Sequence, residues 1–126
     1  MRLHHDDVAS RVEPLFLGGR VATCGIVDLE LLATARTGPV HREIWGERQL
    51  LPRARIDEAC LVRAIEVQAG LADHGQQQQV PIGALIIAAA AEREGLTILH
   101  YDDHFELIAA VTGQAAEWVV PRGRVP

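Results

Sequence analysis

The chain has 126 residues, of which 48% are apolar, and a formal net charge of -5. This composition predicts one soluble globular domain over residues 1–126, and the charge excludes nucleic-acid binding through bulk positive charge. No apolar run is long enough to span a membrane, and the N-terminus lacks the apolar core of a signal peptide. The two cysteines, Cys24 and Cys60, fit a core position in a cytoplasmic protein better than a disulfide framework.

The first part of the chain alternates helical patterns with short apolar runs. A helix is predicted over residues 8–16, and the apolar run over 21–24 is typical of a buried strand. Two further helices are predicted over 26–38 and 39–51, the second with a proline in its first turn. The segment over 52–55 is expected to be a turn or a very short strand.

The most regular helical pattern lies within residues 56–75. Asp57 is the predicted N-cap and Gly75 the predicted stop. The face expected to pack on the core is a stripe of apolar residues: Ala59, Val62, Ile65, Ala69 and Ala72.

The last third of the chain continues the alternation. It predicts a helix over residues 84–94, a strand over 96–100, a helix over 103–113 and a strand over 116–120. Helices alternating with short buried strands favour an α/β domain with a parallel sheet. In such a sheet ligands bind at the carboxyl ends of the strands, where Asp102 is expected to lie.

Four acids near the predicted strand ends are candidates for a polar site. For Asp102 and Asp103 two interpretations stay open, because one of them can serve as a helix cap and both can line a site. Glu30 stands among leucines, including Leu29, that are expected to contact the core, so it lies either on the solvent edge of its helix or in a polar pocket. Asp28 points to the other side of that helix, so Asp28 and Glu30 cannot chelate one ion together.

Two histidines bracket the aspartates. The spacing of His100 and His104 matches no common zinc site, which favours a strand histidine and an exposed histidine at a helix start. A nucleophilic Cys24 is disfavoured, because a cysteine inside a strand is usually inert.

Four segments in order, RVATCGIVDLELLATAR, RAIEVQAGLADHG, PIGALIIAAAAEREGLTILHYDDHFELIAAVTG and EWVV, resemble the PIN domain of VapC-type toxins. These toxins are the ribonuclease halves of bacterial toxin–antitoxin pairs, and the resemblance runs from about Val8 to Val120. It implies a three-layer α/β/α fold with a short parallel sheet, and an acidic site that cuts RNA with Mg²⁺ or Mn²⁺. It also implies a homodimer and a VapB-type antitoxin partner, for which residues 8–16 and 45–51 are candidate contact surfaces.

The resemblance assigns site residues one by one. Glu30 matches the glutamate of the family's first helix, and Asp102 matches the aspartate after its "LHY" strand; both are the implied catalytic residues and metal ligands. Ala84 stands where the family usually has an aspartate, and His104 where it usually has a further acid. Asp103 is the candidate substitute ligand. A cation held by so few carboxylates is expected to bind weakly or not at all, and cleavage is expected to be impaired.

The family also opens with a central strand that carries an aspartate. Residues 1–4 are too short and too polar to replace it, so the chain is expected to be N-terminally truncated and its sheet to lack that strand. Three explanations stay open: a true start upstream of Met1, a decayed gene, or a change introduced at Ala84. The competing functional hypothesis is a catalytically inactive PIN-fold interaction module that dimerises and binds an antitoxin. A third is an unrelated small α/β regulator whose acidic turn is only a helix cap.

Overall fold

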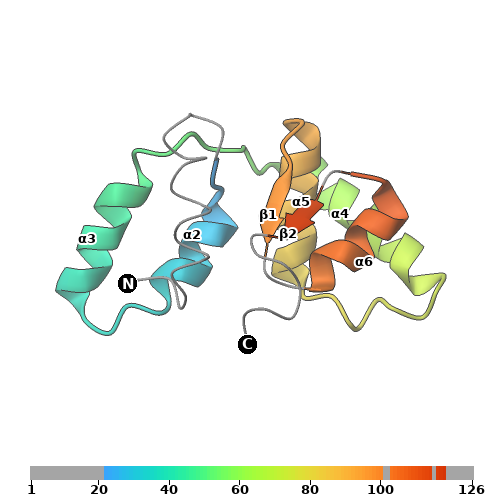
Figure 1. Ribbon diagram of the computed structural model, residues 1–126, viewed down its shortest axis with the longest axis horizontal. Coiled ribbons are helices and arrows are strands. Elements are labelled where there is room, and N and C mark those ends of the chain that lie inside the picture. Colours follow the sequence, from blue (N-terminus) through green and yellow to red (C-terminus); the bar gives the residue numbers. More distant parts are fainter. Residues whose placement is uncertain (1–21, 101–102, 115, 119–126) are drawn as a thin grey trace.

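The computed structural model describes residues 22–100, 103–114 and 116–118, so the helix predicted over 8–16 lies outside the described residues. Helices dominate this part of the chain. Figure 1 shows the helices before residue 50 on one side of the molecule and the later helices, with the short strands, on the other. No helix among the described residues is long and apolar enough to cross a membrane. The elements in chain order are α2 (Gly25–Leu32), α3 (Gly38–Arg48), α4 (Glu58–Ala72), α5 (Ile82–Arg93), β1 (Ile98–His100), α6 (Asp103–Thr112) and β2 (Ala116–Trp118).

The helices begin and end where local signals place them. The Asp57 carboxylate accepts a hydrogen bond from the Cys60 backbone N–H at 3.1 Å and so caps α4, and Gly75 follows the helix with a φ of 69°. The predicted N-cap at Asp57 and the predicted stop at Gly75 are confirmed. At the start of α3 the Thr37 hydroxyl accepts from the Val40 backbone N–H at 3.2 Å, and a proline occupies the first turn.

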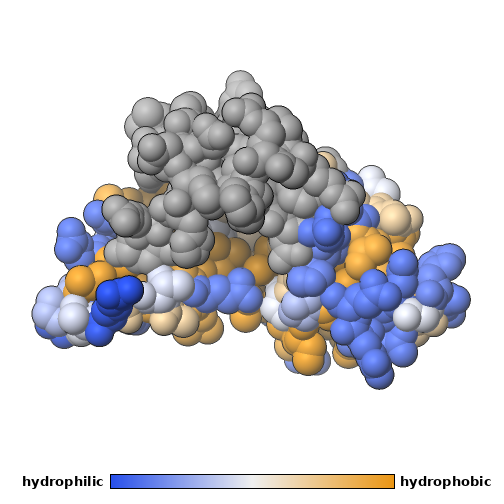
Figure 2. Space-filling model, turned by 60° about the horizontal axis from the view of Figure 1, so that its bottom comes forward, coloured by the Kyte–Doolittle hydropathy of each residue, from blue (hydrophilic) through white to orange (hydrophobic). Residues whose placement is uncertain are grey.

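The face that α4 buries is not the predicted one. Within the predicted stripe, Val62 is 47% exposed and Ile65 is 63% exposed. Figure 2 shows that apolar residues reach the surface on both sides of the grey atoms. The helix has apolar residues on both sides, and its packing against α5 and α6 decides which side is buried. The residues that α4 does bury are Cys60, Ala64, Val67 and Leu71.

The core lies between α4, α5 and α6. Helix α5 contributes a run of small side chains, among them Ala88, Ala89 and Ala90, and the two cysteines are both buried core residues as predicted. Burial raises the pKa of the Cys60 thiol, which therefore stays protonated at neutral pH. The small side chains let the three helices approach one another closely.

The sheet among the described residues is short and parallel. β1 pairs with β2 in the register Ile98 to Ala116 and His100 to Trp118, and α6 forms the crossover between the two strands. The strand predicted over 21–24 is reduced to one parallel bridge between Thr23 and Arg53, in which the Thr23 N–H donates to the Pro52 carbonyl at 2.9 Å. Of the turn or very short strand expected over 52–55, the structure shows the strand, reduced to this bridge. The described residues therefore do not form the full three-layer sandwich.

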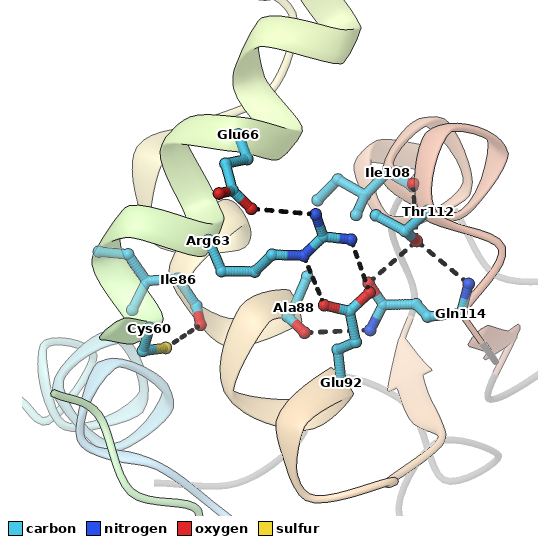
Figure 3. Close-up of polar contacts among 9 residues, drawn as sticks. All are labelled: Cys60, Arg63, Glu66, Ile86, Ala88, Glu92, Ile108, Thr112 and Gln114. Atoms are coloured by element: carbon cyan, nitrogen blue, oxygen red, sulfur yellow. Dashed lines mark hydrogen bonds and ion pairs between the residues drawn. The ribbon is translucent and has the colours of Figure 1, made fainter. Parts of the chain in front are cut away.

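Polar contacts join the helices over the core (Figure 3). The guanidinium of Arg63 on α4 donates to both carboxylate oxygens of Glu92 on α5, at 2.7 and 3.0 Å, and to Glu66 at 3.3 Å. The hydrogen bonds from Arg63 outweigh burial and lower the pKa of Glu92. Beyond α6, the Gln114 amide donates to the Ala88 carbonyl of α5 at 3.0 Å. Helices α4, α5 and α6 are therefore fixed to one another by polar as well as apolar contacts.

The approach of α4 to α6 depends on Gly70. A Cβ at this position would lie 2.6 Å from Cγ1 of Val111, a stiff β-branched side chain. We expect Gly70→Ala to lower the free energy of unfolding by about 1–3 kcal/mol, because overpacking outweighs the gain in helix propensity. Gly46→Ala in α3 is the control, because apart from the backbone of its own helix no atom of the described residues lies within 4 Å of its Cβ position. Urea denaturation should show the control as stable as the unmodified chain or more so, and equal stability of both variants would contradict the packing role.

Candidate functional site

Glu30 lies on the solvent edge of α2 and turns toward the start of α5. Its Oε2 atom is 2.8 Å from the position that a Cβ at Gly83 would take. Helix α2 buries Leu32 at 8% exposure, whereas Leu29 is 66% exposed, so the prediction that Leu29 contacts the core was wrong. The sequence left two positions open for Glu30, the solvent edge of its helix or a polar pocket. The structure places it at the solvent edge, against the first turn of α5.

The first turn of α5 carries no acid and no side-chain cap. Its N-cap residue is Pro81, which offers no side-chain oxygen to the free backbone N–H groups. A helix N-terminus carries a partial positive charge, so the carboxylate of Glu30 is electrostatically favoured there. Ala84 follows Gly83 on this turn and is buried at 7% exposure. The structure thus brings Glu30 to the turn that holds Ala84.

Asp28 has a different environment, as its helical spacing from Glu30 predicted. It is 3% exposed and accepts hydrogen bonds from the Thr23 hydroxyl at 3.0 Å, from Arg48 Nε at 3.0 Å and from Arg53 Nη1. Arg48 also donates to the Thr23 hydroxyl at 2.7 Å. These four residues form the Asp28 cluster, which joins the start of α2 to the end of α3 and the segment after it. Asp28 therefore has a structural role.

The charge of Asp28 is maintained by its partners. Burial raises the pKa of this carboxyl, but the hydrogen bonds from Arg53, Arg48 and Thr23 together outweigh burial and hold the pKa below its usual value. Arg53 also stacks on Trp45, with 5.1 Å between the guanidinium carbon and the ring centroid. No spacing rule predicts this cluster, because the arginines lie 20 and 25 residues beyond the aspartate.

The acidic turn after β1 is only partly described. Asp102 lies outside the described residues, and Asp103 is the exposed first residue of α6. His104 follows in the same turn and is partly buried. Within residues 22–100, 103–114 and 116–118, no three His, Cys, Asp or Glu side chains are grouped to hold a metal ion. A pocket shared by Glu30 and Asp102 therefore stays a prediction.

The comparisons with known proteins identify the class. The family model described as PIN domain matches residues 2–111, and the chain belongs to this family. The ordered segments thus predicted the family correctly. PIN-domain membership gives the chain the α/β class, although helices predominate in the described part.

Individual relatives narrow the class to the VapC group. The chain is 44% identical to Ribonuclease VapC21 of Mycobacterium tuberculosis (strain H37Rv), over 97% of this chain and 89% of the relative. It is 39% identical to Ribonuclease VapC51 of the same strain, over 98% of this chain and 90% of the relative. It is 35% identical to Ribonuclease VapC18, over 95% and 91% respectively. The chain is thus a PIN-domain protein of the VapC type.

Proposed function

We propose that this chain is a VapC-type ribonuclease toxin whose acidic site is incomplete, so that its RNA cleavage is impaired. The observation that carries the proposal is the position of Glu30, whose carboxylate lies against the turn that holds Ala84. By resemblance this turn contributes an aspartate to the active site of the family. In this chain Glu30 of α2 lies against the first turn of α5, but position 84 on that turn carries no carboxylate.

The proposed metal ligands are Glu30, Asp102 and Asp103, and Glu30 and Asp102 are the proposed catalytic residues. Carboxylate oxygen suits hard cations, so the side-chain chemistry of these three residues fits Mg²⁺ or Mn²⁺. A bound cation would supply an activated water and would stabilise the charge that develops at a phosphate. Ala84 offers no donor, and the imidazole of His104 is a poor ligand for Mg²⁺. These changes favour weak metal binding.

The proposed organisation is a single PIN-like domain over residues 1–126 with a three-layer α/β/α arrangement. Its proposed partners are RNA, a VapB-type antitoxin and a second copy of the chain, and its proposed location is the cytoplasm. Trp45 is 37% exposed and Leu50 is 79% exposed, so the segment over 45–51 has apolar surface for a partner. The other candidate surface, residues 8–16, lies outside the described residues.

The alternative function is an interaction module that has lost catalysis. The exposed apolar side chains of the segment over 45–51 favour it, since such a surface binds a partner whether or not the acidic site works. The presence of Ala84 on the α5 turn is compatible with both functions. Partner binding without any cleavage would distinguish the module from an impaired enzyme.

Cleavage of structured RNA tests the proposal. We expect trace cleavage by the unmodified chain with Mg²⁺ or Mn²⁺, abolished by EDTA and by Glu30→Ala, because the cation is held by too few carboxylates. Gel analysis of end-labelled RNA measures it, and Glu43→Ala, at an exposed position of α3, is the control substitution. Strong EDTA-sensitive cleavage would contradict the impairment and support the ribonuclease class. Complete absence of Glu30-dependent cleavage would favour the interaction module.

A further inference from the structure

The approach of Glu30 to α5 depends on the absence of a side chain at position 83. Oε2 of Glu30 lies 2.8 Å and its Cδ 3.8 Å from the position of a Cβ at Gly83. A carboxylate oxygen and a Cβ cannot stay at 2.8 Å, so any other residue at position 83 would displace one of them. The same Cβ position lies 3.4 Å from Cγ2 of Ile26, one turn before Glu30 on α2. A side chain at position 83 would therefore meet α2, and first of all the Glu30 carboxylate.

We propose that Gly83 is a positioning residue for Glu30: its missing side chain leaves the space that the carboxylate occupies, and so directs Glu30 to the turn of α5 that holds Ala84. The inference rests on the proposed function, in which Glu30 is a metal ligand. Gly83 itself has no side chain with which to bind metal or RNA. It acts through the direction of the Glu30 side chain.

The electrostatics of the turn support this role. The turn has no acid of its own and its N-cap, Pro81, provides no side-chain cap, so the carboxylate of Glu30 supplies the negative charge that a helix start favours. Glu30 belongs to α2, and the charge therefore reaches α5 from a neighbouring helix. A methyl group at position 83 would separate the carboxylate from the turn.

We expect Gly83→Ala to change the direction of the Glu30 side chain without lowering the stability of the fold. The displaced atoms are the end of a flexible, exposed glutamate, which can rotate away at little cost, and alanine favours a helix over glycine. The variant should therefore unfold at the same temperature as the unmodified chain or higher. The direction of Glu30 should nonetheless change. A packing glycine would instead lose stability without any effect on metal binding.

The test uses Mn²⁺ as the probe, because a paramagnetic ion broadens nearby amide NMR signals even when it binds weakly. In the unmodified chain we expect the amide signals of Glu30, Gly83 and Ala84 to broaden first as Mn²⁺ is added. In Gly83→Ala the Mn²⁺ concentration for the same broadening at Glu30 and Ala84 should rise about 10-fold, as for residues that orient a metal ligand. The control is Gly46→Ala, since among the described residues no neighbouring element comes within 4 Å of this Cβ position, and it should titrate like the unmodified chain.

A double-mutant cycle distinguishes the role of Gly83 from the metal site itself. In a Glu30→Gln background, Gly83→Ala should cause no further loss of broadening, because the residue acts only through Glu30. Normal Mn²⁺ broadening in Gly83→Ala would overturn the inference and leave the proposed function standing. Absence of selective broadening around Glu30 in the unmodified chain would overturn the proposed metal site, and the inference with it.

Discussion

Asp28→Ala should lower the free energy of unfolding by about 3–5 kcal/mol, because it leaves two arginines beside an empty, buried site. Asp28 is 3% exposed and joins Arg48 and Arg53 to the first turn of α2. Its removal also leaves the Thr23 hydroxyl without this acceptor. Urea denaturation followed by circular dichroism at pH 7 measures the change. Asp73→Ala, an exposed aspartate after α4, is the control and should stay within about 0.5 kcal/mol of the unmodified chain.

The effect of Asp28 should depend on pH in one direction. The pKa of Asp28 is lowered in the folded state, so its contribution to stability is fully present above the unfolded pKa of about 3.9 and is lost as the pH falls through the folded value. The difference between Asp28→Ala and the unmodified chain should therefore be constant from about pH 5 to 8 and shrink in stronger acid. A difference that shrinks between pH 8 and 6 instead would contradict the assignment of this charge.

Local signals predicted the parts of the fold that depend on local chemistry. The cap at Asp57 and the stop at Gly75 follow from a side-chain hydrogen bond and a left-handed backbone conformation, both of which are properties of a few neighbouring residues. The family was predicted from the resemblance of four segments that occur in the same order along the chain. The helix start that holds Ala84 was predicted close to its actual position, since α5 begins two residues earlier, at Ile82.

The features that the sequence did not predict depend on contacts between residues far apart in the chain. Helix α4 has two apolar sides, and only its contacts with α5 and α6 decide which one is buried. The arginine partners of Asp28 come from residues 20 and 25 positions away, which no helical or strand period can predict. The contact between Glu30 and the Gly83 position joins two residues that lie 53 positions apart in the chain. Sequence spacing thus placed Glu30 on its helix but gave no information on what faces it.

Restoring a carboxylate with Ala84→Asp should raise the affinity for Mn²⁺ by at least about 10-fold, if position 84 faces the same cation as Glu30. Ala84 is buried in the first turn of α5, so the new aspartate has little access to water and lies on the same turn that Glu30 approaches. Two neighbouring carboxylates repel each other without a cation and share its charge when one binds. The metal-free variant should therefore be less stable than the unmodified chain, and Mn²⁺ should stabilise it selectively.

Thermal unfolding with increasing Mn²⁺ measures this gain, because a ligand at 100 times its dissociation constant stabilises the folded state by about 2.7 kcal/mol. Ala69→Asp, which adds the same charge on the exposed side of α4, should show no such response. Adding Glu30→Gln to Ala84→Asp should remove most of the gain, since the two ligands would share one ion. RNA cleavage should not return with Ala84→Asp alone, because His104 still stands at a position where the family carries an acid. An unchanged Mn²⁺ response would mean that position 84 does not face the cation, and the proposed correspondence between Ala84 and the family's aspartate would then be wrong.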